Sequence, residues 1–184
     1  SPGVLHAETP RERAVAFCAK QKTVRAELLG HWTYDSRGGP FKFRTTVVIE
    51  KGEHDGKPCY HLVRESNTPM RKVPDRVEVS VAPNLKLLAA RKTGESFHEL
   101  TEETLKLDGD HYTLTDDSGE VTEFDAGPAL IAQAYDVYLQ LIACALPLDQ
   151  AGSYEFQRWF QMSQDLGPML FTVTPGTGEV VVQA

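Results

Sequence analysis

Hydrophobic and polar residues follow two different periods along the 184-residue chain. Over residues 10–29, apolar residues recur every three or four positions, which predicts an amphipathic helix. From residue 31 onward the period falls to two, as in residues 41–49, which is typical of strands with one buried face. Turn sequences such as Arg37-Gly38-Gly39-Pro40 separate these strands at hairpin spacing, so residues 31–126 are expected to form an antiparallel β-meander.

The meander is followed by a segment, residues 128–146, that is apolar on nearly every side. Its polar residues Gln133, Asp136 and Gln140 are spaced so that they form one narrow line along a helix. Residues 153–183 then return to the period of two and are expected to be the closing strands.

About ten short strands make a sheet too wide to stay flat. We therefore expect a single, mainly β domain, an antiparallel meander curled into an open barrel or half-barrel, with an N-terminal helix. The apolar helix is expected on the concave face, where most of its sides are covered. Helix and sheet either fill that concavity completely or leave a gap for a lipid-like ligand, and the pattern leaves both possibilities open.

Aromatic and aliphatic residues that share strand faces are the candidates for lining such a gap. Arg64 and Arg158 lie on two of these faces, and a guanidinium in an apolar concavity is costly unless an anion pairs with it. Either an anionic headgroup binds there, or strand twist brings both arginines to the rim, where they are solvated or paired with Glu65 or Glu155. The candidate ligand-binding residues are Trp32, Tyr34, Phe41, Phe43, Tyr60, Leu62, Arg64, Phe156, Arg158 and Phe160.

Motifs for other chemistry are sparse. The cysteines have no CxxC spacing. Either all three are buried thiols, which is the simpler expectation, or one disulfide forms and leaves a free thiol: Cys18, Cys59 and Cys144. Cys59 and His61 alternate onto one strand face, but two ligands do not make a metal site, and His98 or His111 would have to join them. No nucleophile elbow, phosphate loop or dinucleotide fingerprint occurs. We expect no metal, no cofactor and no catalytic residue.

The net charge of −7 comes from 19 basic and 26 acidic residues. This balance argues against a nucleic-acid partner or an anionic lipid surface, because either would be repelled. No transmembrane segment is expected, since residues 128–146 carry a polar line and a span needs about 20 mainly apolar residues. The expected partner is a lipid or another apolar small molecule, and a protein partner is unknown.

Two resemblances add to this interpretation. Gly30-His31-Trp32 resembles the Gly-x-Trp that opens the first strand of lipocalin-like barrels. A longer series of segments is spread over about residues 28–182. In chain order these segments are LGHWTYD (29–35), GG (38–39), GKPCYH (56–61), DRVEVSV (75–81), NLKL (84–87) and LPL (146–148). Their order and spacing resemble an uncharacterised family of exported bacterial proteins. The resemblance implies an open antiparallel β-barrel, similar in shape to periplasmic carriers of lipoproteins, with an exported location and an apolar ligand.

The leading hypothesis is a non-enzymatic carrier or binding protein for an apolar or amphipathic molecule. The alternative is a protein-interaction or scaffold domain whose core is filled and which holds no small molecule. An enzyme built on the barrel is the third hypothesis, and it would require converging polar groups with perturbed pKa values in a cleft.

Overall fold

The computed structural model describes residues 7–127, 130–131, 135–160, 163 and 165–184. More than half of these residues lie in strands, which confirms the mainly β fold predicted from the alternation. The elements in chain order are α1 (Pro10–Lys20), the 3₁₀ helix η1 (Ala26–Leu28), β1 (Gly30–Gly38), β2 (Phe41–His54), β3 (Lys57–Asn67), β4 (Asp75–Val81), β5 (Leu87–Ser96), β6 (Glu99–Asp108), β7 (His111–Thr115), β8 (Val121–Asp125), β9 (Leu130–Ile131), α2 (Asp136–Ala145), β10 (Gly152–Phe160), β11 (Asp165–Thr174) and β12 (Glu179–Gln183).

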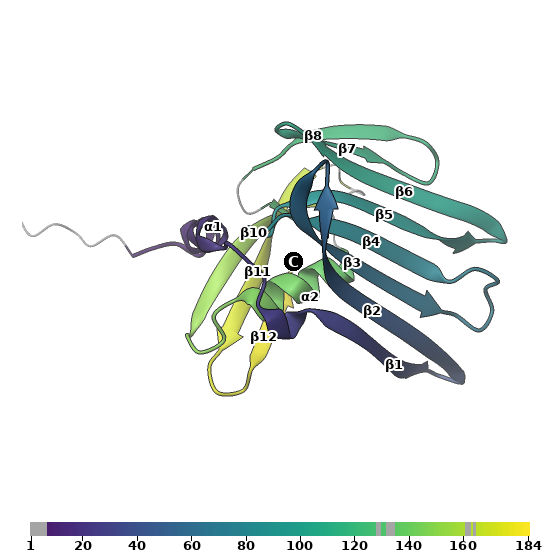
Figure 1. Cartoon of the computed structure of the whole chain (residues 1–184), viewed down its shortest axis with the longest axis horizontal. Helices are drawn as coiled ribbons and strands as arrows, with labels where there is room; N and C mark the ends of the chain where they lie inside the picture. Colours follow the sequence, from purple (N-terminus) through teal and green to yellow (C-terminus); the bar gives the residue numbers. More distant parts are fainter. Residues whose placement is uncertain (1–6, 128–129, 132–134, 161–162, 164) are drawn as a thin grey trace, which may run out of the picture.

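Strands β1 to β8 form one sheet in which each strand pairs with its neighbours in sequence. This sheet does not close on itself, and Figure 1 shows it curving around α2 as a half-barrel. The strands predicted over residues 153–183 do not extend this meander. They form a second sheet in the order β12-β11-β10-β9, in which the short β9 runs parallel to β10.

The N-terminal helix is shorter than the predicted 10–29. It begins at a capping box formed by Thr9 and Glu12, but it ends at Lys20. The chain beyond it is extended because Thr23 and Val24 are β-branched, which disfavours helix. The backbone N–H of Val24 also donates to the Tyr60 hydroxyl at 3.0 Å, a contact that a continued helix would lose.

The second helix also begins later than predicted, at Asp136 instead of residue 128. Within the segment before it, Leu130–Ile131 form β9, whereas residues 128–129 and 132–134, including Gln133, lie outside the described residues. Asp136 and Gln140 are exposed, as their polar line predicts. No helix among the described residues is long and apolar enough to cross a membrane.

Helix α2 lies on the concave face of the eight-stranded sheet, as predicted (Figure 1). Its buried face carries Val137, Tyr138, Leu141 and Ile142. The Tyr138 hydroxyl donates to the Leu85 carbonyl at 2.7 Å, which ties the helix to the chain between β4 and β5. The core therefore lies between α2 and the inner faces of both sheets, and most of the concavity is filled by side chains.

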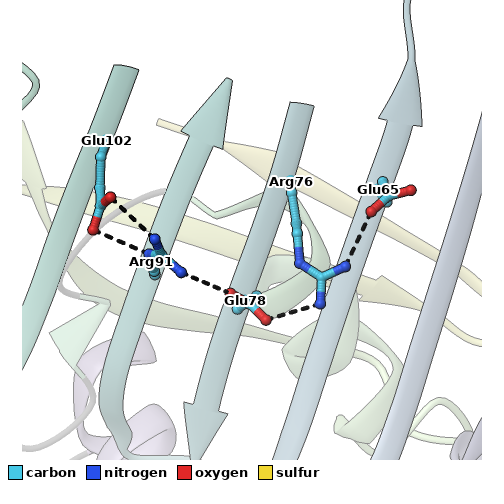
Figure 2. Close-up of polar contacts among 5 residues, drawn as sticks. All are labelled: Glu65, Arg76, Glu78, Arg91 and Glu102. Atoms are coloured by element: carbon cyan, nitrogen blue, oxygen red, sulfur yellow. Dashed lines mark hydrogen bonds and ion pairs between the residues drawn. The ribbon is translucent and has the colours of Figure 1, made fainter. Parts of the chain in front are cut away.

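The outer face of the same sheet is polar. Five residues form a ladder of alternating charge across β3 to β6 in the order Glu65, Arg76, Glu78, Arg91 and Glu102, shown in Figure 2. The register places Glu65 opposite Arg76 and Glu78 opposite Arg91, so the charges meet across strands. The hydrogen bond from Arg91 lowers the pKa of Glu102.

Candidate functional site

An apolar pocket of about 410 Å³ opens between the β1–β2 hairpin and α2. Its walls are mainly apolar side chains from three different segments of the chain. Val47 and Ile49 of β2 form the buried side, and Leu141 of α2 lies across from them. The lining residues are Leu28, Trp32, Thr33, Tyr34, Val47, Ile49, Gln140, Leu141 and Cys144.

Trp32 and Tyr34 face the protein interior without being covered by it. The register places Trp32 opposite Val47 and Tyr34 opposite Thr45, so the two aromatic side chains share the inner face with buried residues. Nevertheless, Trp32 is 42% exposed and Tyr34 is 46% exposed. The reason is that β1 is the edge strand of the sheet, and α2 does not extend far enough to cover it.

A second, polar pocket of about 530 Å³ lies on the same concave face. Arg64 contributes to it together with Arg71, Lys92 and Glu103. Arg64 is also the cross-strand neighbour of Val47, which places it next to the apolar pocket. This face of the sheet therefore changes from apolar to charged between two adjacent strands.

The arginine at this boundary is paired within the protein. Arg64 Nε lies 2.9 Å from Asp136 Oδ2, at the first residue of α2. The alternative prediction that Arg64 pairs with Glu65 is wrong, because consecutive residues of a strand point to opposite faces. Glu65 instead accepts a hydrogen bond from Arg76 on the outer face at 3.0 Å.

The other predicted lining residues of the first sheet do not join the apolar pocket. Tyr60 and Leu62 are buried in the filled core, and the Tyr60 hydroxyl lies 2.9 Å from Thr23 Oγ1. Phe41 is exposed at the start of β2. Phe43 lines a pocket with basic residues at the end of the β1–β2 hairpin.

The candidates on the second sheet are also separate from the apolar pocket. Phe156 is buried and packs edge-to-face on Phe171, with ring centroids 5.1 Å apart. It also lines another pocket, of about 400 Å³, beside α1. Arg158 is half-buried on β10, so the two predicted arginines lie on different sheets. The side chain of Phe160 lies outside the described residues.

The cysteines are free thiols with different surroundings. Cys59 is buried as predicted, but Cys18 is only half-buried and Cys144 is exposed. Cys144 is exposed because it lies in the last turn of α2, beside the open pocket. Burial raises the pKa of Cys18 to about 11, and burial together with Glu53 raises the pKa of Cys59. Both thiols are therefore protonated near neutral pH and are poor nucleophiles.

The suggested metal ligands Cys59 and His61 do lie together. Cys59 Sγ is 3.6 Å from His61 Nε2, and His61 Nδ1 is 3.1 Å from the Ser80 hydroxyl. The other two histidines lie elsewhere, with His98 beside a glutamate and His111 beside an aspartate. In the part of the chain that the structure describes, no group of three or more His, Cys, Asp or Glu residues is placed to hold a metal ion.

Sequence reasoning missed several lining residues of the apolar pocket. Leu141 and Cys144 lie on the helix that the sequence places on the concave face. Leu141 follows Val137 by four residues and Cys144 follows Gln140 by four residues, and this ordinary helical spacing gives no signal for an opening. Leu28 was assigned to the N-terminal helix, whereas it belongs to η1 and borders the pocket. Only the meeting of β1 with α2 in the folded chain defines these positions.

Comparison of the chain with protein-family models, with curated proteins and with solved structures gave no match. Function is therefore inferred from the geometry of this chain alone.

Proposed function

We propose that this protein binds an apolar or amphipathic small molecule, without catalysis, in the pocket between β1–β2 and α2. The observation that carries the proposal is the exposure of Trp32 and Tyr34 on the inner face of an edge strand. Large aromatic side chains on a core-facing surface are normally covered, because water contact with apolar area is unfavourable. A ligand in the pocket of about 410 Å³ would cover both rings.

The surroundings of Arg64 support an amphipathic ligand with an anionic end. The guanidinium is adjacent to the apolar pocket, and its partner Asp136 is half exposed to solvent. A ligand carboxylate or phosphate would compete with Asp136 for Arg64 and release the aspartate into water. Asp136→Asn is therefore expected to increase affinity for a long-chain carboxylate and to leave affinity for the matching alcohol unchanged.

Cys144 gives a direct test of the pocket. The purified protein is titrated with an apolar fluorescent probe, N-phenyl-1-naphthylamine, and with a fluorescent long-chain carboxylate, before and after alkylation of Cys144 with a bulky maleimide. Alkylation is expected to abolish binding, since Cys144 lines the pocket. Cys144→Ser protein treated with the same reagent is the matched control and should bind normally. Failure of the unmodified protein to bind any probe, or equal binding after alkylation, would contradict the proposal.

The second candidate function is protein interaction, and one observation favours it. All residues of β1 are exposed, and β1 pairs with β2 alone in the described sheet, so one side of its backbone is open to an added strand. The pair Gly38–Phe41 closes the two-residue turn, so the backbone N–H of Arg37 points to the open edge, and Arg37→Pro is expected to impair strand addition. An exported, periplasmic location is also part of the proposal and rests only on the sequence resemblance.

A further inference from the structure

The inner face of the eight-stranded sheet changes from apolar to polar toward one end of its strands. Cross-strand neighbours form rows on this face, and successive rows are two residues, roughly 7 Å, apart. The row that contains Leu62 and Leu105 is buried and apolar. The next row mixes apolar and charged residues, and from β1 to β6 it runs through Trp32, Val47, Arg64, Val77, Lys92 and Glu103. The three charged residues of this row line the polar pocket of about 530 Å³.

One wall of the polar pocket is an ion pair that the protein completes by itself. Arg71 Nη1 donates to both carboxylate oxygens of Asp75, at 2.7 Å and 2.8 Å. The Asp75 carboxylate lies against Gly94, where an added Cβ would stand 2.5 Å from Asp75 Oδ1. Glycine at this position therefore gives the carboxylate room beside the backbone of β5. Because Arg71 and Asp75 compensate each other's charge, they shape the pocket without selecting the charge of a ligand.

Two further charged groups of the lining have partners within the protein. Glu95 is buried, and its Oε2 accepts the backbone N–H groups of Lys72 at 2.9 Å and Val73 at 3.3 Å. Arg64 Nε lies 2.9 Å from Asp136 Oδ2. The two contacts differ in how easily a ligand replaces them, because the Glu95 side chain is 7% exposed and that of Asp136 is 51% exposed. The aspartate can return to water, so Arg64 is open to exchange.

The remaining charged residues of the pocket, Lys92, Glu103 and Asp117, form no ion pair with any residue that the structure describes. Lys92 and Glu103 are cross-strand neighbours on β5 and β6, and Asp117 is exposed in the turn after β7. The Tyr135 hydroxyl donates to Glu103 Oε1 at 3.1 Å. Burial, together with Glu103, raises the pKa of Tyr135, so its hydroxyl stays protonated as a donor. Within the described part of the chain, Glu103 Oε2 accepts no hydrogen bond and faces a ligand's donor instead.

The polar and apolar pockets are adjacent, so one molecule can occupy both. Val47 lines the apolar pocket, and its cross-strand neighbour Arg64 lines the polar one. Helix α2 borders both pockets as well. Gln140 lines the apolar pocket, and Asp136, one helical turn earlier, contacts Arg64. An acyl chain beside Trp32 therefore brings the headgroup of the same molecule to Arg64.

The presence of both signs of charge in one pocket selects the headgroup. A purely anionic headgroup would contact Arg64 and Lys92, but it would face Glu103 and Asp117 without compensation. A zwitterionic headgroup satisfies both sets. Arg64 and Lys92 lie two strands, roughly 10 Å, apart, which favours a phosphate with several acceptor oxygens over a smaller anion. No described residue of the lining is aromatic, and quaternary ammonium groups are typically held by aromatic cages, so an ammonium that keeps its N–H groups fits better than choline.

We propose that the polar pocket holds the headgroup of the ligand and that this headgroup is a phosphate joined to a primary ammonium. The phosphate accepts hydrogen bonds from Arg64 and Lys92 and displaces Asp136 into water. The ammonium donates to Glu103 and Asp117. The ligand is therefore a single-chain phospholipid of the phosphoethanolamine type. This inference rests on the function proposed above and adds the identity of the headgroup to it.

Isothermal titration calorimetry with lysophospholipids of one acyl chain, below their critical micelle concentrations, tests the headgroup. The panel is lysophosphatidylethanolamine, lysophosphatidylglycerol and lysophosphatidylcholine. We expect the ethanolamine lipid to bind at least about tenfold more tightly than either of the others. A Glu103→Gln, Asp117→Asn double variant should lose this preference, while glutamine still accepts the hydrogen bond from the Tyr135 hydroxyl. Asp108→Asn with Glu123→Gln removes two exposed carboxylates that line none of the described pockets; this matched control should keep the preference.

The readouts separate this inference from the function on which it rests. Far-UV circular dichroism and the melting temperature establish that both double variants are folded. Equal affinities for the three lipids, tighter binding of the glycerol lipid, or an unchanged preference in the variant without Glu103 and Asp117 overturns the headgroup assignment. The proposed function stands in each of these cases if alkylation of Cys144 still abolishes binding of N-phenyl-1-naphthylamine. Absence of binding for the dye and for all three lipids overturns both proposals.

Discussion

Replacing Leu141 by alanine tests whether the pocket beside β1 is open in the unliganded protein. Leu141 is 2% exposed and contributes both to the core and to the pocket wall. Leu87 is the matched comparison, because it is 0% exposed and borders none of the described pockets. Both substitutions remove the same atoms, so any difference between their effects on the free energy of unfolding comes from how tightly each side chain is enclosed.

The transfer contribution is the same at both positions. Removing three carbons at about 0.8 kcal/mol each lowers the free energy of unfolding by about 2.4 kcal/mol. At Leu87 a sealed void adds a cavity penalty, and the loss should reach about 3–5 kcal/mol. At Leu141 the truncation enlarges a pocket that already meets solvent, so the loss should stay at about 2–3 kcal/mol.

Equilibrium urea denaturation, followed by the fluorescence of Trp32 and Trp159, measures both losses. With a slope of about 2 kcal/mol/M, Leu141→Ala should lower the urea midpoint by about 1 M and Leu87→Ala by more. Leu141→Ala should also keep probe binding, since its pocket is larger. A loss for Leu141→Ala as large as that for Leu87→Ala would show that the site is sealed and would refute the reasoning.

Three further substitutions test local contacts. Tyr138→Phe leaves the buried carbonyl that its hydroxyl contacts without a donor; the expected loss is about 1–2 kcal/mol, seen as a fall in melting temperature of about 2–8 °C. Burial alone would raise the pKa of Glu95, but hydrogen bonds from backbone N–H groups and from His98 lower it below the usual 4.5. The stability it provides is therefore present above that value and lost as pH falls through the lowered pKa, so Glu95→Gln should destabilise the protein near neutral pH and converge with wild type in acid melts. Gly52→Ala would place a methyl carbon 2.1 Å from His61 Cδ2, so the ring must rotate away; faster alkylation of Cys59, measured by mass spectrometry, is expected.

The alternation of polar and apolar residues was sufficient to predict the strands, because each strand contacts the core on one face only. It was not sufficient for the helix ends. Residues 21–29 have the apolar spacing of a helix. Val24 nevertheless lies in an extended segment, where its side chain is buried and its backbone N–H donates to the Tyr60 hydroxyl. The spacing of buried residues alone does not distinguish a continued helix from an extended segment, because the hydrogen bond that favours the extended segment is made with Tyr60, a residue 36 positions away.

The candidate site was predictable only in part for a related reason. Trp32 and Tyr34 lie on the inner face of the sheet, but the sequence pattern treats all inward-facing aromatic residues as one lining. Strand order decides which of them are covered: Tyr60 lies on β3 beneath the chain after α1, whereas β1 is an edge. The alternation of polar and apolar residues in a strand predicts which face of the sheet each side chain lies on. It does not predict how far the strand lies from the edge of the sheet.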